Sequence, residues 1–159
     1  GFKVMFQKNG HNHGRCIKSA MKIATDLCAE RGVRLTALRS HVLELIWQSH
    51  QPVGAYELLD ILKSERRNAQ PPTIYRALNF LLNLGLIHRI ESLNAYVGCD
   101  TPHTNHNTQF LICSGCGAAA EISDVRLDKA INALAKDAKF SVNHRSIEVE
   151  GQCPNCQVS

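Results

Sequence analysis

The chain has 159 residues, of which 44% are hydrophobic and 20% are charged, and this composition excludes wholesale disorder and suits one ordinary domain or two small ones. No apolar run approaches the roughly 18 residues of a membrane-spanning helix, and the opening residues lack the continuous apolar stretch of a signal peptide, so we expect a cytoplasmic protein without a membrane partner. Residues 1–98 carry 13 Lys and Arg against 7 Asp and Glu, whereas residues 99–159 carry 5 against 7, which makes the first part the candidate for a polyanionic partner.

Helices are expected to dominate the first part of the chain. After a flexible tail at residues 1–14, apolar side chains recur at helical spacing in four stripes, which are Ile17–Cys28, Leu38–Ile46, Leu58–Leu62 and Ile74–Leu82. Thr36 is placed to cap the second helix and Gly85 to end the fourth. Two short β-prone runs around residues 92–95 then predict a hairpin. Helices followed by a hairpin are the order of a winged helix, which we assign to residues 15–98.

The second part of the chain mixes strands with one helix, so the predicted fold class is α+β. The polar stretch at residues 99–107 is rich in turn formers and is expected to be a hinge. An α/β domain is predicted over residues 108–159. Its expected elements are a strand at 110–112, a strand at 118–122, a helix that turns Leu127, Ile131, Leu134 and Ala138 inward, and a last strand at 140–149.

Two Cys-x-x-Cys pairs, in "FLICSGCG" and "GQCPNCQ", dominate the chemistry of the second part. Seven cysteines are an odd number, which excludes a complete disulfide framework. One such pair beside an oxidoreductase pattern would indicate a redox site, and lone cysteines are often core residues. Two pairs in one chain instead indicate a closed tetrahedral zinc site of structural type, formed by Cys113, Cys116, Cys153 and Cys156.

A second metal site is predicted around the hairpin. If the turn is centred between Leu93 and Asn94, His88 pairs directly with Cys99 across the two strands, and the Cβ atoms of such a pair lie roughly 4.5–5.5 Å apart. His106 in the hinge and Glu121 on the next strand complete a set of one thiolate, two imidazoles and one carboxylate, which suits zinc. The thiolate disfavours iron and manganese.

Each of these four residues also has an ordinary interpretation, because Glu121 suits a surface, Cys99 a core and His106 a loop. His103 is the alternative to His106, which we prefer for its spacing to Cys113. The metal-binding roles of four further residues stay open, namely His144 and, toward the start of the chain, His11, His13 and Cys16.

The helix that starts near Thr73 has an outer face that suits DNA. Tyr75, Arg76 and Asn79 lie away from its apolar stripe, and the second helix of a helix-turn-helix presents such residues to the major groove. Arg76 is placed for a bidentate contact to a guanine. Thr73 and Tyr56 are further candidate DNA contacts. The alternative is an ordinary solvated helix surface.

Several motifs together carry a resemblance to a known family. The segments "RLTALR", "AYELLDIL", "PPTIYRALNFLLNLGLIHRIES", "FLICSGCG" and "GQCPNC" occur in the order found in the ferric uptake regulator family, and the zinc uptake branch is the most similar. The resemblance implies a homodimer that binds inverted-repeat operator DNA through two winged helices when it is loaded with metal. It also implies a dimerisation domain at residues 108–159, two zinc ions per subunit, and the four-residue set around His88 as the regulatory zinc site.

The chain departs from the iron branch of this family at one informative place. That branch has a His-His-Asp-His run immediately before its "LIC" segment, where this chain has Asn107, Thr108, Gln109 and Phe110. We therefore predict a zinc-responsive repressor of zinc uptake genes. The alternatives are a sensor of iron, manganese, nickel or peroxide, a zinc-ribbon interaction module, and a zinc hydrolase. Four protein ligands leave no open coordination position for a hydrolase, so neither an enzyme nor a small-molecule substrate is expected.

Overall fold

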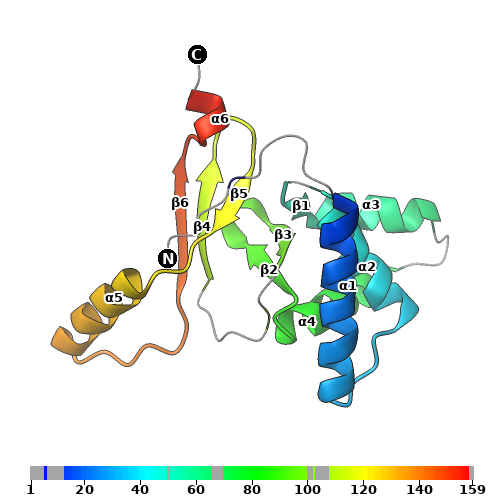
Figure 1. Ribbon diagram of the computed structural model, residues 1–159, viewed down its shortest axis with the longest axis horizontal. Helices are drawn as coiled ribbons and strands as arrows, with labels where there is room; N and C mark the ends of the chain where they lie inside the picture. The colour runs from blue at the N-terminus through cyan, green and yellow to red at the C-terminus, as the bar shows by residue number, and fades with distance from the viewer. Residues whose placement is uncertain are drawn as a thin grey trace. The chain divides into compact units, whose positions relative to one another are not determined.

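The computed structural model describes residues 6, 13–49, 51–65, 70–99, 102 and 108–157. These residues form two compact units (Figure 1). The described residues from 13 to 102 make the first unit, and those from 108 to 157, together with residue 6, make the second. No helix in the described part of the chain is both long and apolar enough to cross a membrane.

Four helices form the body of the first unit, as the apolar periodicity predicts. They are α1 (His13–Glu30), α2 (Ala37–Gln48), α3 (Ala55–Glu65) and α4 (Pro71–Asn83). Thr36 caps α2 as expected, because its hydroxyl accepts a hydrogen bond from the backbone N–H of Arg39. Gly85 follows α4 with a φ of +73°, a left-handed conformation that glycine adopts without strain. The predicted apolar stripes meet in one core that includes Leu27, Val42, Leu58, Ile74 and Leu78.

A three-stranded antiparallel sheet completes the first unit. The predicted hairpin is formed by β2 (Ile87–Ile90) and β3 (Ala95–Gly98), which are joined by the short 3-10 helix η1 (Glu91–Leu93). The sequence pattern missed the two-residue strand β1 (Val53–Gly54), which pairs with β3 to give the order β1-β3-β2. A strand of two residues is too short to show an alternating pattern in the sequence.

The second unit is a three-stranded sheet with one long helix. Strand β4 (Thr108–Cys113) pairs antiparallel with β5 (Ala119–Glu121) and parallel with β6 (Ser146–Gly151). A parallel pair needs a crossover connection, and α5 (Val125–Asp137) supplies it. The short helix α6 (Pro154–Gln157) follows β6 and lies beside the β4–β5 turn (Figure 1). The strands expected at 110–112 and 118–122 are confirmed.

Two expectations for the second unit are wrong. The last strand begins at Ser146 rather than at residue 140, and residues 138–145 form an irregular connection. Helix α5 buries none of its residues, and Leu134, which was expected to face inward, is 68% exposed. The apolar stripe of α5 exists, but no other element of the described second unit covers it.

Candidate metal centres and nucleic-acid interface

The two Cys-x-x-Cys pairs meet at one end of the second sheet. Cys113 is the last residue of β4, and Cys116 lies in the turn that follows. Cys153 and Cys156 come from the segment after β6 and from α6. The parallel pairing of Cys113 with Gly151 brings the two segments together. The structure therefore joins four cysteines that the sequence separates by 36 residues.

The spacing of the four sulfurs fits a zinc ion. Their Sγ atoms all lie within 4.8 Å of one another, and those of Cys116 and Cys153 are 3.8 Å apart. Sulfurs bound tetrahedrally to zinc at about 2.3 Å are separated by about 3.8 Å, whereas a disulfide needs about 2.05 Å. None of the seven cysteines, all within the described ranges, forms a disulfide. The donor set fits a closed structural zinc site better than a redox pair.

Hydrogen bonds within this cluster favour a thiolate at one of its cysteines. The backbone N–H of Cys153 donates to Cys113 Sγ over 3.3 Å. This bond, reinforced by the N–H groups of Cys116 and Gly115, lowers the pKa of the Cys113 thiol to about 6. Hydrogen bonds with the other three sulfurs, first that of Cys113, raise the pKa of Cys156 to about 12. The charge of the neighbouring Cys113 thiolate also raises the pKa of Cys156, and a bound metal ion would neutralise this mutual repulsion.

His88 and Cys99 are neighbours, although they are not the direct pair that the sequence predicted. His88 pairs with Val97, and Cys99 instead donates its N–H to Leu86 O over 3.0 Å. The register differs because η1 and the left-handed Asn94 place four residues, 91–94, between the strands. The shift is by two residues, so both side chains stay on one face of the hairpin. A ring nitrogen of His88 and Cys99 Sγ lie within 4.8 Å.

This face of the hairpin is the one opposite the helical core. Ile87 and Tyr96 point into that core, whereas His88, Ile90 and Cys99 alternate to the other side. Cys99 is only 3% exposed and His88 is half-buried. A buried thiol beside an imidazole is a soft, partly dehydrated donor pair that suits zinc or copper better than magnesium or calcium.

The other predicted metal ligands come from other parts of the sequence. Glu121 belongs to the second unit, where it is half-buried and pairs with Phe110 at the end of β5. His106 and its alternative, His103, lie outside the described residues. His144 is exposed and belongs to no group of three metal-binding side chains within the described ranges. His11 and the side chain of His13 are likewise outside them, while Cys16 is half-buried on α1.

Helix α4 presents its predicted polar face to solvent. Ile74, Ala77, Leu78 and Leu81 are buried, whereas the four predicted contact residues of this helix are exposed, namely Thr73, Tyr75, Arg76 and Asn79. Tyr56, near the start of α3, is 76% exposed, which is unusual for a large aromatic side chain that has no partner outside the chain. The structure thus offers an arginine, two tyrosines and two small polar side chains to an external partner.

A cation–π contact orients α4 on α2. The Arg39 guanidinium lies over the Phe80 ring, 3.7 Å from its centroid, and donates a hydrogen bond to Arg34 O over 2.8 Å. Such stacking fixes the rotation of one helix on another better than apolar contacts alone. Arg39 was not predicted as a contact residue, because an arginine at the border of an apolar stripe carries no distinguishing signal in the sequence.

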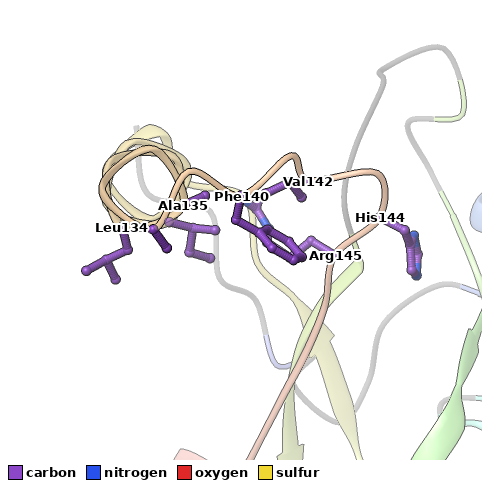
Figure 2. A pocket seen from close by; sticks show the side chains of 8 residues that line it. Leu134, Ala135, Phe140, Val142, His144 and Arg145 are labelled. Carbon is purple, nitrogen blue, oxygen red and sulfur yellow. The ribbon is translucent and has the colours of Figure 1, made fainter.

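The second unit has an apolar surface that the sequence analysis also missed. A hollow of about 440 Å³ is lined by one side of α5 and by the connection from α5 to β6 (Figure 2). Large side chains around it are exposed, with Leu134 at 68%, Phe140 at 66% and Val142 at 40%. Arg145 is buried at its edge and pairs with Asp128 of α5. The signal was present in the amphipathic pattern of α5, which requires a covering partner.

Comparison with known proteins gives consistent matches. Residues 30–150 match the model of the ferric uptake regulator family. The chain is 40% identical over 136 residues to the zinc uptake regulation protein of Escherichia coli, covering 84% of this chain and 78% of that protein. A solved zinc uptake regulator complexed with zinc and DNA is similar with a TM-score of 0.83 at 38% identity, covering 88% of this chain and 94% of that one. Holo XcZur gives a TM-score of 0.80 at 41% identity, with 89% and 99% covered.

Proposed function

Because the chain belongs to the ferric uptake regulator family, we propose that it is a zinc-responsive transcriptional repressor that binds palindromic operator DNA as a dimer and controls zinc uptake genes. The observation that carries this proposal is the presence of two separate donor sets in one chain. The four-cysteine cluster is complete in itself. The His88–Cys99 pair lies in the other unit, beside a helix with a DNA-binding pattern. The four-cysteine cluster would hold a structural zinc ion, and the site at His88 and Cys99 would hold the zinc ion that is sensed.

We propose that His88, Cys99, His106 and Glu121 bind the regulatory zinc, so that each subunit carries two zinc ions. The proximity of His88 and Cys99 supports the first two ligands. A ligand set drawn from both units would link zinc occupancy to the spacing of the two recognition helices in a dimer. Two such helices meet a palindrome only at one separation and angle, so zinc would raise the affinity for DNA without touching it.

DNA contact is assigned to the exposed residues of α3 and α4, namely Tyr56, Thr73, Tyr75, Arg76 and Asn79. Arg76 lies in the second turn of α4, where recognition helices reach base edges. The structure supports this role because the opposite side of α4 is fully used by the core and by the Arg39–Phe80 contact. The net charge of +6 on residues 1–98 supports attraction to the phosphate backbone.

The homodimer is proposed to form through the second unit. This unit exposes five large apolar side chains, which belong to α5, to β6 and to the connection between them. They are between 40% and 68% exposed, namely Val125, Leu134, Phe140, Val142 and Val149. Three of them, Leu134, Phe140 and Val142, line one hollow, and exposed apolar side chains gathered in this way are typical of a protein interface. A second copy would present the same surface and close the contact with two-fold symmetry.

This function implies a division of labour along the chain. We propose that residues 15–98 are the winged-helix DNA-binding domain, residues 99–107 the hinge and residues 108–159 the dimerisation domain, with residues 1–14 as a flexible tail. The protein would act in the cytoplasm and without catalysis, because complete four-ligand sites leave no coordination position for a reacting water.

One experiment tests the function as a whole. The purified protein is titrated with a zinc chelator while its metal content and its affinity for a palindromic duplex are measured together. We expect DNA binding to disappear as the second zinc per subunit is removed, while the first zinc remains bound. If iron, manganese or nickel restores DNA binding at a lower concentration than zinc does, the protein is instead a sensor of that metal. Zinc-independent binding would exclude the proposal.

A further inference from the structure

The only tryptophan of the chain packs directly on the backbone of Gly98. Trp47 lies in the last turn of α2, and Gly98 is the last residue of β3. A Cβ atom at position 98 would lie 2.3 Å from Cε2 and 2.5 Å from Nε1 of the indole. Contacts below 3.0 Å are essentially never found for real Cβ atoms. The indole therefore occupies the place of the side chain that Gly98 lacks.

This contact lies immediately behind the proposed zinc ligands. Cys99 is the next residue, and successive side chains of a strand point to opposite faces of the sheet. The Trp47 ring therefore meets the core-facing side of the strand, and the thiol of Cys99 points to the other. Gly98 pairs with Ile87, the neighbour of His88, and the N–H of Cys99 is bonded to Leu86 O. The backbone that carries both ligands is thus held by hydrogen bonds between the strands of the hairpin and, on its core-facing side, by contact with the Trp47 indole.

From Trp47 the packing continues to the recognition helix. Helix α2 buries Val42, Leu43 and Ile46 in the core that also contains the buried face of α4. The two helices contact each other, and the Arg39–Phe80 stacking joins the first turn of α2 to α4. Trp47 and Arg39 lie near opposite ends of α2. Helix α2 therefore connects the strand that carries Cys99, through the Trp47–Gly98 contact, with α4, through the Arg39–Phe80 contact.

We propose that Trp47 is a positioning residue through which metal binding at Cys99 and His88 sets the position of α4. This inference rests on the proposed zinc-sensing function. In a tetrahedral site, a sulfur at about 2.3 Å and a nitrogen at about 2.05 Å from zinc are about 3.6 Å apart, and the donor atoms of this pair lie within 4.8 Å of each other. A bound ion would fix Cys99 relative to His88 and thereby restrain the strand at residues 98 and 99. Packed interiors transmit such a restraint because no free space absorbs a displacement.

The single tryptophan makes the proposal directly observable in the intact dimer. Zinc is added to protein that already holds its four-cysteine zinc, and the indole emission is recorded. We expect the emission to change with the same midpoint as the gain in affinity for the operator duplex. In Cys99→Ser the change should be absent. An emission that does not respond in the wild-type protein, while zinc still activates DNA binding, would overturn the proposal.

A pair of glycine variants tests whether the contact is required. Gly98→Ala places a methyl group against the indole, whereas Gly54→Ala, in the neighbouring strand β1, meets nothing within 4 Å. The ratio of DNA affinities with and without regulatory zinc is measured for both. We expect this ratio to fall by roughly threefold to thirtyfold in Gly98→Ala and to stay unchanged in Gly54→Ala. Thermal unfolding and the content of four-cysteine zinc report whether each variant is folded.

A compensating substitution distinguishes coupling from general destabilisation. Trp47→Leu should also lower the affinity ratio, because the smaller side chain leaves a gap behind the strand. In the double variant Trp47→Leu with Gly98→Ala, the methyl group fills part of this gap, and the ratio should recover above that of either single variant. Equal ratios in all three variants and the wild type would refute the role of Trp47 and leave the zinc-dependent repressor standing. A wild type without zinc-dependent DNA binding would instead refute the proposed function.

Discussion

The Sγ atoms of Cys116 and Cys153 lie 3.8 Å apart. Two sulfurs that bind one zinc ion tetrahedrally, with bonds of about 2.3 Å, are separated by about the same distance. These residues come from segments that are distant in the sequence, one from the turn after β4 and the other from the segment after β6. A metal ion at this position would join both segments. The stability of the second unit should therefore depend on it.

Removing one ligand of this cluster should destabilise the second unit. We expect Cys113→Ser to lose its bound zinc and to lower the midpoint of thermal unfolding, because structural zinc contributes of order 10 kcal/mol to the folding of small zinc domains. Calorimetry and metal analysis measure both effects, with Cys16→Ser as the cysteine control. A zinc-free Cys113→Ser protein that unfolds like the parent would show that the cluster is not structural.

Zinc loading of this cluster should release more protons as the pH falls. The pKa of Cys113 is lowered to about 6, so this thiol is ionised at pH 7 in the metal-free folded protein and becomes protonated as the pH falls through about 6. Its ionised form therefore stabilises the metal-free fold above that pH, and this contribution is lost below it. Zinc must displace about 0.7 of a proton more at pH 5.5 than at pH 7.5. Calorimetric titrations in buffers of different ionisation enthalpy count these protons, and an unchanged number would contradict the assignment.

Replacing the predicted base-reading residue should weaken DNA binding selectively. We expect Arg76→Ala to reduce operator affinity by about 1–3 kcal/mol and to relax the preference at one base pair, with unchanged zinc binding. Arg126→Ala removes the same charge from an exposed site in the other unit and serves as the control. Fluorescence anisotropy with operator and random duplexes separates the outcomes, since a uniform loss on both would indicate a phosphate contact.

Replacing the thiol of the hairpin should abolish the zinc response without damage to the second unit. We expect Cys99→Ser to keep the four-cysteine zinc and the dimer while losing most of the zinc-dependent gain in DNA affinity, a coupling of about 1–3 kcal/mol. The linkage is reciprocal, so operator DNA should tighten zinc binding by the same factor in the parent and not in the variant. A variant that responds to zinc like the parent would place the sensing site elsewhere.

A charge on the exposed apolar surface of the second unit should break the dimer. Phe140 is 66% exposed, and burying such a side chain is worth about 1.5–3 kcal/mol. A two-fold interface contains it twice, so Phe140→Asp should weaken dimerisation by about 3–6 kcal/mol. Sedimentation equilibrium measures the change, with Asn143→Asp, in the same connection, as the control. An intact Phe140→Asp dimer would exclude this surface as the interface.

Local patterns in the sequence were sufficient for most of the fold. The apolar stripes of α2, α3 and α4 have a clear helical period, and Thr36 and Gly85 mark helix ends by chemistry that depends only on neighbouring residues. The exposed face of α4 follows from the same period. The pairing of the two Cys-x-x-Cys segments was also predictable, because two such pairs in one chain have few explanations other than a shared metal ion.

Tertiary structure decided what depends on register and on contacts between distant residues. The pairing of His88 with Val97 rather than Cys99 results from the turn at residues 91–94, and a shift of two residues leaves no trace in an alternating pattern. The exposure of Leu134 shows that a helical stripe predicts which side is apolar but not whether the same chain covers it. The contact of Trp47 with Gly98 could not be predicted, because the absence of a side chain gives no signal until the neighbour that fills its place is known.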